Sequence, residues 1–378
     1  KNTKQSKMSL RGLLSSSKAS TNDIIDDIVA FKKDHKKEVE LYKRIVNEQC
    51  INRALTSPHT TNPFSNGVEN VSESSATSSR TGFEPNVTLL QIQSKPTPIT
   101  CYYDEVDSNA KTVLLFPRGE DSCMDYFRRT IQGQFRDLLA GMKLNLIICE
   151  YRKLVNGCID LLSTVQSDIH QIFKGITKHK SLRINPKNLT VIGRGVTGSL
   201  VACEFAKSYS MLQGLILESP VAQVTKLIPR PTPGYVHHAL PYSHEQIEAA
   251  INYFYNQCEK IQRYSGRLLI LHSKQDTTVH LDHAEELYQS AGSRSKGLVI
   301  FDEGNHRQTF QANFVEYVEA LVEFLKSCDH VIPQSFESLL TMLDEIRLYD
   351  EISEQQNGAT PEEEDTMTDT DIWSDYQL

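Results

Sequence analysis

The sequence lacks any apolar segment long enough to cross a membrane, and it has a single tryptophan and no closely spaced pair of cysteines. Its longest apolar runs, such as Leu144–Cys149 and Leu268–Leu271, fall far short of the about 20 residues that a spanning helix needs. The first residues are basic and Ser-rich and contain no apolar core of the kind found in secretory signals. We therefore expect no transmembrane segment and no secretion signal.

Eight cysteines are scattered over the 378 residues, and none stands in a Cys-x-x-Cys motif. Cys149 and Cys203 lie in apolar stretches, where a cysteine acts as a small core residue. This usage argues against a disulfide scaffold or a structural zinc site and is typical of a reducing compartment, so we predict a cytoplasmic protein. We expect no cofactor and no metal, because His237-His238 has no carboxylate or cysteine partner at a suitable spacing.

The net charge of −8 is unevenly distributed along the chain. Residues 1–60 hold 12 Lys and Arg against 7 Asp and Glu, whereas residues 350–378 hold 10 Asp and Glu and no basic residue. The acidic balance therefore comes from the C-terminal segment. No sustained basic surface is indicated, so we expect no nucleic-acid partner.

The N-terminal part of the chain has three segments that differ in amino-acid composition. Residues 1–19 are polar and predicted to be disordered, and residues 20–55 have the apolar spacing of an amphipathic helix. This helix would pack on the body of the protein, form a short coiled coil or lie on a membrane surface. Residues 56–86 are rich in Ser, Thr and Asn and are predicted to be a flexible linker.

The C-terminal part is predicted to be a helix over 329–356, centred on about 335–348, followed by a disordered acidic tail over 357–378. Trp373 lies in this tail. The tail would be either a solubilising segment or a short acidic-aromatic motif that docks on a basic groove of a partner protein. The N-terminal helix and the Trp373 tail are thus the candidate sites for an unknown protein partner.

The segment 87–328 alternates short apolar runs with helical patterns. Such alternation predicts an α/β fold with a mainly parallel sheet of about eight strands, covered by helices on both faces. The strands are expected at 87–92, 99–106, 112–116, 144–149, 189–192, 214–217, 267–271 and 297–301, and the helices at 124–140, 159–177, 196–208, 245–263, 281–290 and 310–327.

Four of the turns that follow these strands carry glycines or polar residues. They are Gly193–Gly198 before a helix, His272–Val279 with Asp276, Glu303–His306, and Pro117–Asp121. Ligands of open parallel sheets bind at the carboxyl ends of the strands, so these turns are expected to meet at one edge.

The order of these elements and turns resembles the α/β-hydrolase superfamily over about residues 87–328. In that family the first turn is a Gly-x-Ser-x-Gly nucleophile elbow, followed along the chain by an acid and then a histidine. The resemblance implies that Asp276 matches the acid, that His306 matches the general base, and that Gly195 stands where the serine belongs. Three segments are similar to depalmitoylase-like serine hydrolases, namely Tyr151-Arg152, Asn185–Asn188 and Leu215–Pro220.

The resemblance also implies an altered oxyanion hole, the group of amides that would stabilise a negatively charged intermediate. Its amides would come from Val196 and Glu120, and Arg118 stands in place of the usual histidine. Glu120 and Asp121 would put negative charge beside a site meant for an oxyanion. Thr197 stands in place of the second glycine of the elbow motif.

These departures favour a non-catalytic pseudo-hydrolase that acts in protein interaction or scaffolding, because a triad without a nucleophile cannot transfer an acyl group. Two alternatives remain open. One is an esterase, thioesterase or peptidase that uses Thr197, Ser199 or a water molecule activated by His306. The other is a small-molecule sensor that binds an acyl or lipid-like ligand in the former pocket.

Overall fold

The computed structural model describes residues 87–94, 98–119, 121–128, 130–150, 165–179, 184–227 and 244–338, together with Lys37, Leu182 and Thr341. The predicted N-terminal helix, linker and acidic tail lie outside the described residues, apart from Lys37. Glu120, His237-His238 and Trp373 also lie outside them.

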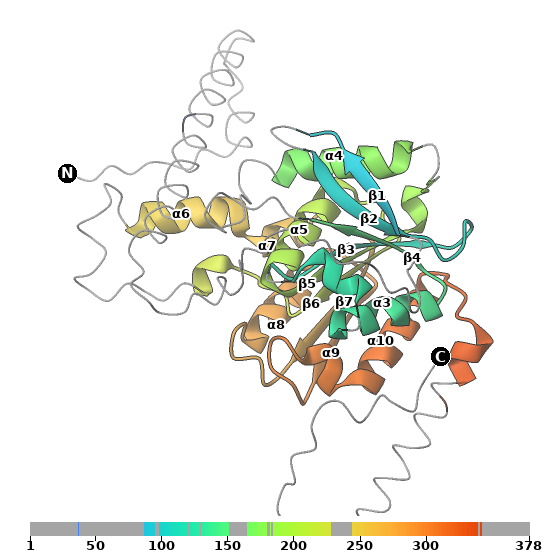
Figure 1. Cartoon of the computed structure of the whole chain (residues 1–378). Coiled ribbons are helices and arrows are strands. Elements are labelled where there is room, and N and C mark those ends of the chain that lie inside the picture. The colour runs from blue at the N-terminus through green and yellow to red at the C-terminus, as the bar shows by residue number, and fades with distance from the viewer. Residues whose placement is uncertain are drawn as a thin grey trace, which may run out of the picture.

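Eight strands form one twisted sheet in the order β1-β2-β4-β3-β5-β6-β7-β8 (Figure 1). The pairs β1–β2 and β2–β4 are antiparallel and the other five pairs are parallel. The expectation of a mainly parallel sheet of about eight strands is therefore confirmed. The strands are β1 (Val87–Ile92), β2 (Ile99–Asp104), β3 (Thr112–Phe116), β4 (Asn145–Cys149), β5 (Leu189–Arg194), β6 (Gly214–Glu218), β7 (Arg267–Ser273) and β8 (Lys296–Phe301).

The central strands are buried along their whole length. Every residue of β3, β4, β5 and β6 is buried, which explains why these strands are mostly apolar in the sequence. Strand β8, at one edge of the sheet, is buried only at Phe301. The core thus lies around the middle of the sheet.

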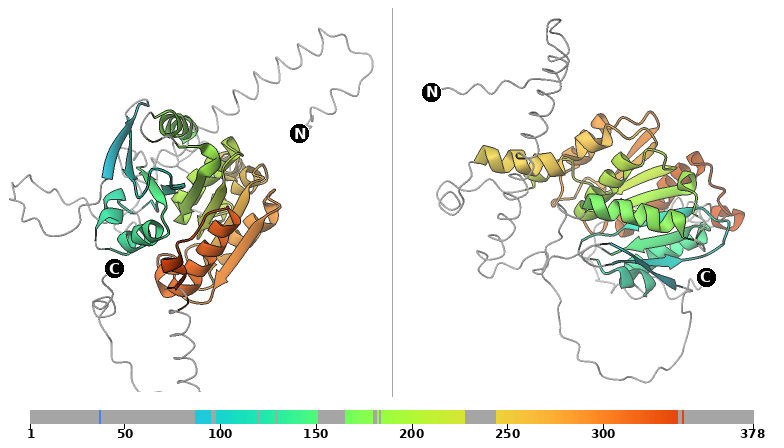
Figure 2. Two further views of the ribbon diagram at one scale, coloured as in Figure 1. Left: turned by 90° about the vertical axis from the view of Figure 1, so that its right-hand side faces the viewer. Right: turned by 90° about the horizontal axis from the view of Figure 1, so that it is seen from above.

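Helices cover both faces of the sheet, and each face has its own cluster of buried apolar side chains. One cluster joins the sheet to α4 (Val165–Lys178), α5 (Gly195–Ser208), α7 (Gln257–Ile261) and α8 (Leu281–Ser290). The other joins it to η1 (Cys123–Phe127), α3 (Ile131–Gly141), α9 (Thr309–Ala312) and α10 (Phe314–Ser327). The same layers can be followed in two further views (Figure 2).

Three helices that the sequence predicts as continuous are interrupted, so these three predictions were wrong in detail. Thr130, Asn256 and Asn313 stand at the breaks that precede α3, α7 and α10. Thr130 accepts a hydrogen bond from the amide of Gly133, and Asn256 accepts one from the amide of Glu259. Such side chains stabilise the first turn of a new helix, which is why the chain restarts there. Asn256 also follows α6 (His244–Tyr255).

The boundaries of other elements move by a few residues. Strand β5 continues through Gly193 to Arg194, which the sequence assigned to the turn. Within the segment 329–356 the C-terminal helix begins at residue 334, close to the expected start at about 335, and its course beyond 338 lies outside the described residues except for Thr341. No helix in the described part of the chain is long and apolar enough to cross a membrane.

Candidate functional site

The four turns that the sequence singled out follow β3, β5, β7 and β8. These strands run parallel within the sheet, so their carboxyl ends lie at the same edge. Arg118 follows β3, Gly195 follows β5, Asp276 follows β7 and His306 follows β8. The sheet therefore brings these four predicted positions to one edge of the molecule.

Gly195 occupies a sharp turn between a strand and a helix. It follows the last residue of β5 directly and is the first residue of α5, and its φ is +65°. That backbone conformation is strained for residues other than glycine. The turn is also tight, because a Cβ atom on Gly198 would lie 2.4 Å from the carbonyl oxygen of Phe116. The chain thus has a strand–turn–helix corner in which β5, α5 and the end of β3 touch.

Arg118 lies directly over Gly195. A Cβ atom built on Gly195 would lie 2.9 Å from Cγ of Arg118 and 3.4 Å from its Cδ. Arg118 itself is only 3% exposed, and its Nε has no hydrogen-bond partner. The aliphatic part of this arginine therefore occupies the space that a side chain at position 195 would need.

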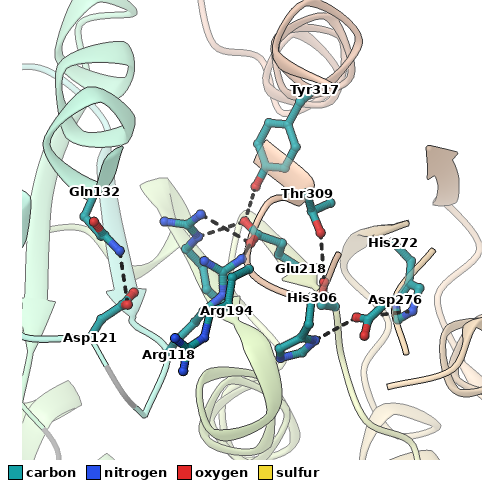
Figure 3. Close-up of polar contacts among 12 residues, drawn as sticks. Arg118, Asp121, Gln132, Arg194, Glu218, His272, Asp276, His306, Thr309 and Tyr317 are labelled. Carbon is teal, nitrogen blue, oxygen red and sulfur yellow. Dashed lines mark hydrogen bonds and ion pairs between the residues drawn. The ribbon is translucent and has the colours of Figure 1, made fainter. Parts of the chain in front are cut away.

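Asp276 and His306 form a buried hydrogen-bonded pair (Figure 3). His306 Nδ1 donates to Asp276 Oδ2 over 2.7 Å, and the amides of Thr278 and Val279 donate to Asp276 Oδ1 over 2.9 and 2.8 Å. Burial alone would raise the pKa of Asp276, but the bond to His306 and the Val279 amide outweigh it, so the pKa lies below its ordinary value. Asp276 is therefore held as a carboxylate that fixes the orientation of the His306 ring.

A second histidine and a serine hold the two loops in place. His272 is fully buried, its Nε2 donates to the Val279 carbonyl over 2.8 Å, and the same nitrogen lies 3.8 Å from Asp276 Oδ2. Burial lowers the pKa of His272, which keeps the ring neutral. Ser273 donates to the carbonyls of Glu303 and Gly304 and so ties the β7 turn to the β8 turn. Neither His272 nor Ser273 was predicted from the sequence to have a role of its own.

A buried charge network that was not predicted from the sequence lies beside the Gly195 turn. Glu218 Oε2 accepts from Arg194 Nε over 2.8 Å and from the Tyr317 hydroxyl over 2.5 Å, and its Oε1 pairs with Arg118 (Figure 3). Burial would raise the pKa of Glu218, but the charges of Arg194 and Arg118 lower it to about 2. The guanidinium of Arg194 also lies 4.3 Å from the centre of the Phe135 ring.

A sequence signal for this network exists. Arg194 and Glu218 each end a strand that is otherwise apolar, and the parallel register places them opposite each other. A lone charge at the end of a buried strand needs a partner of opposite sign. The pairing becomes predictable only when β5 and β6 are known to be neighbours.

The remaining predicted positions are placed as follows. Val196 is half-buried and is the second residue of α5, where a backbone amide has no acceptor within the helix. Thr197 and Ser199 are buried in the same helix, and the Ser199 hydroxyl donates to the Val196 carbonyl over 2.9 Å. Among the described residues no group of three or more His, Cys, Asp or Glu side chains could hold a metal ion.

The sheet order, the helices on both faces and the turn at Gly195 define an α/β-hydrolase fold. One solved structure with this fold is the uncomplexed acylaminoacyl peptidase of Pyrococcus horikoshii, with 15% identity and a TM-score of 0.51 over 67% of this chain and 43% of that chain. Another is the Pyrococcus furiosus esterase Pf2001, with 17% identity and a TM-score of 0.49 over 64% of this chain and 93% of that chain.

The likeness at these identities establishes the fold alone. No protein-family model matches the chain, and no curated protein is significantly similar to it. The fold is hydrolase-like, and because one fold carries many functions, the function of the chain depends on the residues at its site.

Proposed function

We propose that this chain is a non-catalytic relative of the serine hydrolases that acts in protein interaction or scaffolding. The observation that supports this proposal is Gly195, a residue without a hydroxyl at the strand-to-helix turn where such enzymes hold their nucleophile. The candidate partner-binding segments are residues 20–55 and the acidic tail with Trp373.

The chemistry of acyl transfer explains why one missing atom is decisive. A serine hydroxyl becomes a nucleophile only when a histidine takes its proton, and a carboxylate orients that histidine. The pair of Asp276 and His306 has the geometry for this task, with a 2.7 Å bond between Oδ2 and Nδ1. Without an oxygen at position 195 the pair has no proton to remove. We propose that the hydrogen bond between Asp276 and His306 instead holds together the turns after β7 and β8.

Arg118 supports the same proposal independently. Its Cγ lies 2.9 Å from where a Cβ at position 195 would be, and its guanidinium is anchored on buried Glu218. A serine placed at 195 would therefore have to displace an arginine that a buried charge holds. Two separate changes, at positions 195 and 118, oppose nucleophilic catalysis at the same point.

The alternative of a hydrolase with an unusual nucleophile is favoured by one observation, the intact Asp276–His306 bond. A water molecule activated by His306 could attack an ester in place of a serine. Knockouts of catalytic triads retain roughly 10³–10⁴-fold rate enhancement over water, so such activity would be measurable. Thr197 and Ser199 are weaker candidates because both are buried within α5.

Labelling with a fluorophosphonate probe, which reacts with activated serines, tests the proposal. We expect no labelling of the native chain and little of Gly195→Ser, because Arg118 crowds the new side chain. We expect the double variant Gly195→Ser, Arg118→Ala to be labelled at least about tenfold more than Gly195→Ser, a difference worth about 1.4 kcal/mol in the barrier.

His306→Ala is the control in both the native and the double-variant background, and a melting curve for each variant shows that it is folded. A panel of short acyl esters is assayed in parallel. Labelling or ester turnover by the native chain that His306→Ala abolishes would overturn the proposal and establish the hydrolase alternative.

A further inference from the structure

Two cysteines face each other across the antiparallel pair of strands β2 and β4, in the half of the sheet opposite the β8 edge. Cys101 of β2 and Cys149 of β4 are partners in the register, and their Sγ atoms lie 2.7 Å apart. Their exposed fractions are 0% and 1%, and both side chains belong to the core cluster that packs against α4 and α5. Both are free thiols in the structure.

The hydrogen-bond pattern shows which kind of antiparallel site this is. The amide of Glu150 donates to the carbonyl of Thr100 over 2.9 Å, so Thr100 and Glu150 are a hydrogen-bonded pair. Such pairs alternate with non-hydrogen-bonded ones, so Cys101 and Cys149 occupy a non-hydrogen-bonded site, where the Cα atoms approach to about 4.5 Å. That spacing lies within the roughly 4.4–6.8 Å that disulfides span.

We propose that Cys101 and Cys149 are a site of disulfide formation, at which a low-molecular-weight disulfide such as oxidised glutathione oxidises them. One cysteine thiolate attacks a sulfur of the reagent, whose S–S bond breaks to release one glutathione thiolate. The second cysteine thiolate then attacks the protein sulfur of the mixed disulfide and releases the second glutathione. The two departing thiolates take up the two cysteine protons, so two protein thiols are oxidised and one reagent disulfide is reduced to two thiols.

The burial of the pair determines when this reaction occurs. Burial, together with the neighbouring Cys101 thiol, raises the pKa of the Cys149 thiol well above its ordinary value, so the reactive thiolate is scarce in the folded protein. Oxidation therefore takes place while β2 and β4 are assembling, before the core closes. Once formed, the bond is shielded from soluble reductants by the same burial.

The bond would connect the antiparallel part of the sheet to its parallel part. Strand β4 pairs antiparallel with β2 and parallel with β3, so the link ties the β1–β2 pair to the parallel sheet. It joins residues 48 apart in the sequence, a separation at which a native disulfide restricts the unfolded chain substantially. We expect the oxidised form to melt on the order of 5–10 °C above the reduced form.

Peptide mapping of the full chain tests the proposal. The denatured chain is refolded once with oxidised and reduced glutathione and once with reduced glutathione alone, and free thiols are then blocked. Trypsin places the two cysteines in separate peptides, 81–111 and 144–152. We expect a single cross-linked species of these two peptides after oxidative refolding, and none after reducing refolding.

Cysteine variants separate this site from the others. Cys101→Ala and Cys149→Ala should each abolish both the cross-link and the rise in melting temperature, whereas Cys328→Ala, at another buried cysteine, should leave both unchanged. Two outcomes overturn the proposal: thiols 101 and 149 that remain fully alkylatable after oxidative refolding, or a cross-link through the nearby Cys123 instead. The native chain alone yields either result, so the test does not depend on the variants folding.

Discussion

The buried Glu218 carboxylate binds two guanidinium groups, those of Arg118 and Arg194, and accepts a hydrogen bond from the Tyr317 hydroxyl. Its side chain is fully buried, as is that of Arg194, and Arg118 is only 3% exposed. Arg118, Arg194 and Glu218 end or follow three adjacent strands, β3, β5 and β6. A buried charge that loses its partner is costly, so these three residues hold the strand ends together as a unit.

Acid should weaken this network in a defined pH window. The pKa of Glu218 is lowered from 4.5 to about 2, so its contribution to stability is complete above about pH 5 and is lost as the pH falls towards 2. A shift of this size is worth roughly 3 kcal/mol. Chemical unfolding of the native chain over this pH range should therefore show a loss of unfolding free energy that is steeper than that of Glu218→Gln, in which Asp276 still titrates.

At neutral pH Glu218→Gln should cost about 3–5 kcal/mol, because it leaves two buried guanidinium groups without a counter-charge. Glu259→Gln is the control, since Glu259 is exposed and pairs with Arg263 on the surface at 3.5 Å. That control should change the unfolding free energy by less than about 0.5 kcal/mol. Equal effects of the two substitutions would contradict the argument.

Two glycines shape the β5–α5 corner, one through its backbone conformation and the other through a close backbone contact. Gly195 supplies the positive φ, and Gly198 allows the first turn of α5 to touch the end of β3. The contact at Gly198 involves the backbone oxygens of Phe116 and Pro117, which cannot rotate away as a side chain can. The corner is thus fixed by backbone packing, whether or not a nucleophile stands in it.

Gly198→Ala tests this account of the corner. The new Cβ would lie 2.4 Å from the Phe116 oxygen, so we expect a loss of about 1–3 kcal/mol in unfolding free energy. Gly297→Ala in β8 is the matched control, because its Cβ would lie 3.4 Å from Leu269 Cδ1, an ordinary contact. Urea unfolding of both variants measures the difference, and a Gly198→Ala chain as stable as Gly297→Ala would refute it.

In the described part of the chain, the two core clusters that cover the faces of the sheet are built from residues between Leu90 and Phe336. The acidic charge is concentrated elsewhere, since residues 350–378 carry 10 acidic and no basic side chains. The two core clusters and the most acidic part of the sequence therefore lie in different segments of the chain.

Deleting residues 350–378 should separate the stability of the chain from its net charge. The net charge would change from −8 to +2, because −8 minus −10 is +2. At pH 7 the full chain should bind to an anion-exchange resin, whereas the shortened chain should bind to a cation-exchange resin. We expect the melting temperature to stay within about 2 °C, since neither core cluster loses a residue. A drop of more than about 5 °C would show instead that the deleted segment packs on the core.

Much of the fold was predictable, for reasons that particular elements make clear. Strands such as β3 and β6 are mostly apolar, and the alternation with helices predicts a parallel sheet. The helix breaks at Thr130 and Asn256 were not predicted, because a capping side chain can equally sit on the surface of a continuous helix. His272 was missed because nothing local distinguishes a buried histidine that holds a loop from an exposed one.

The sequence by itself determined the residue types at the strand ends: a glycine at 195, an acid at 276 and a histidine at 306. It also determined the order of the elements that carry them. Only the tertiary structure decided that His306 bonds to Asp276, that Arg118 lies over Gly195 and that Cys101 faces Cys149. These contacts join residues 30 or more positions apart, so they depend on strand order and register, which no local pattern encodes.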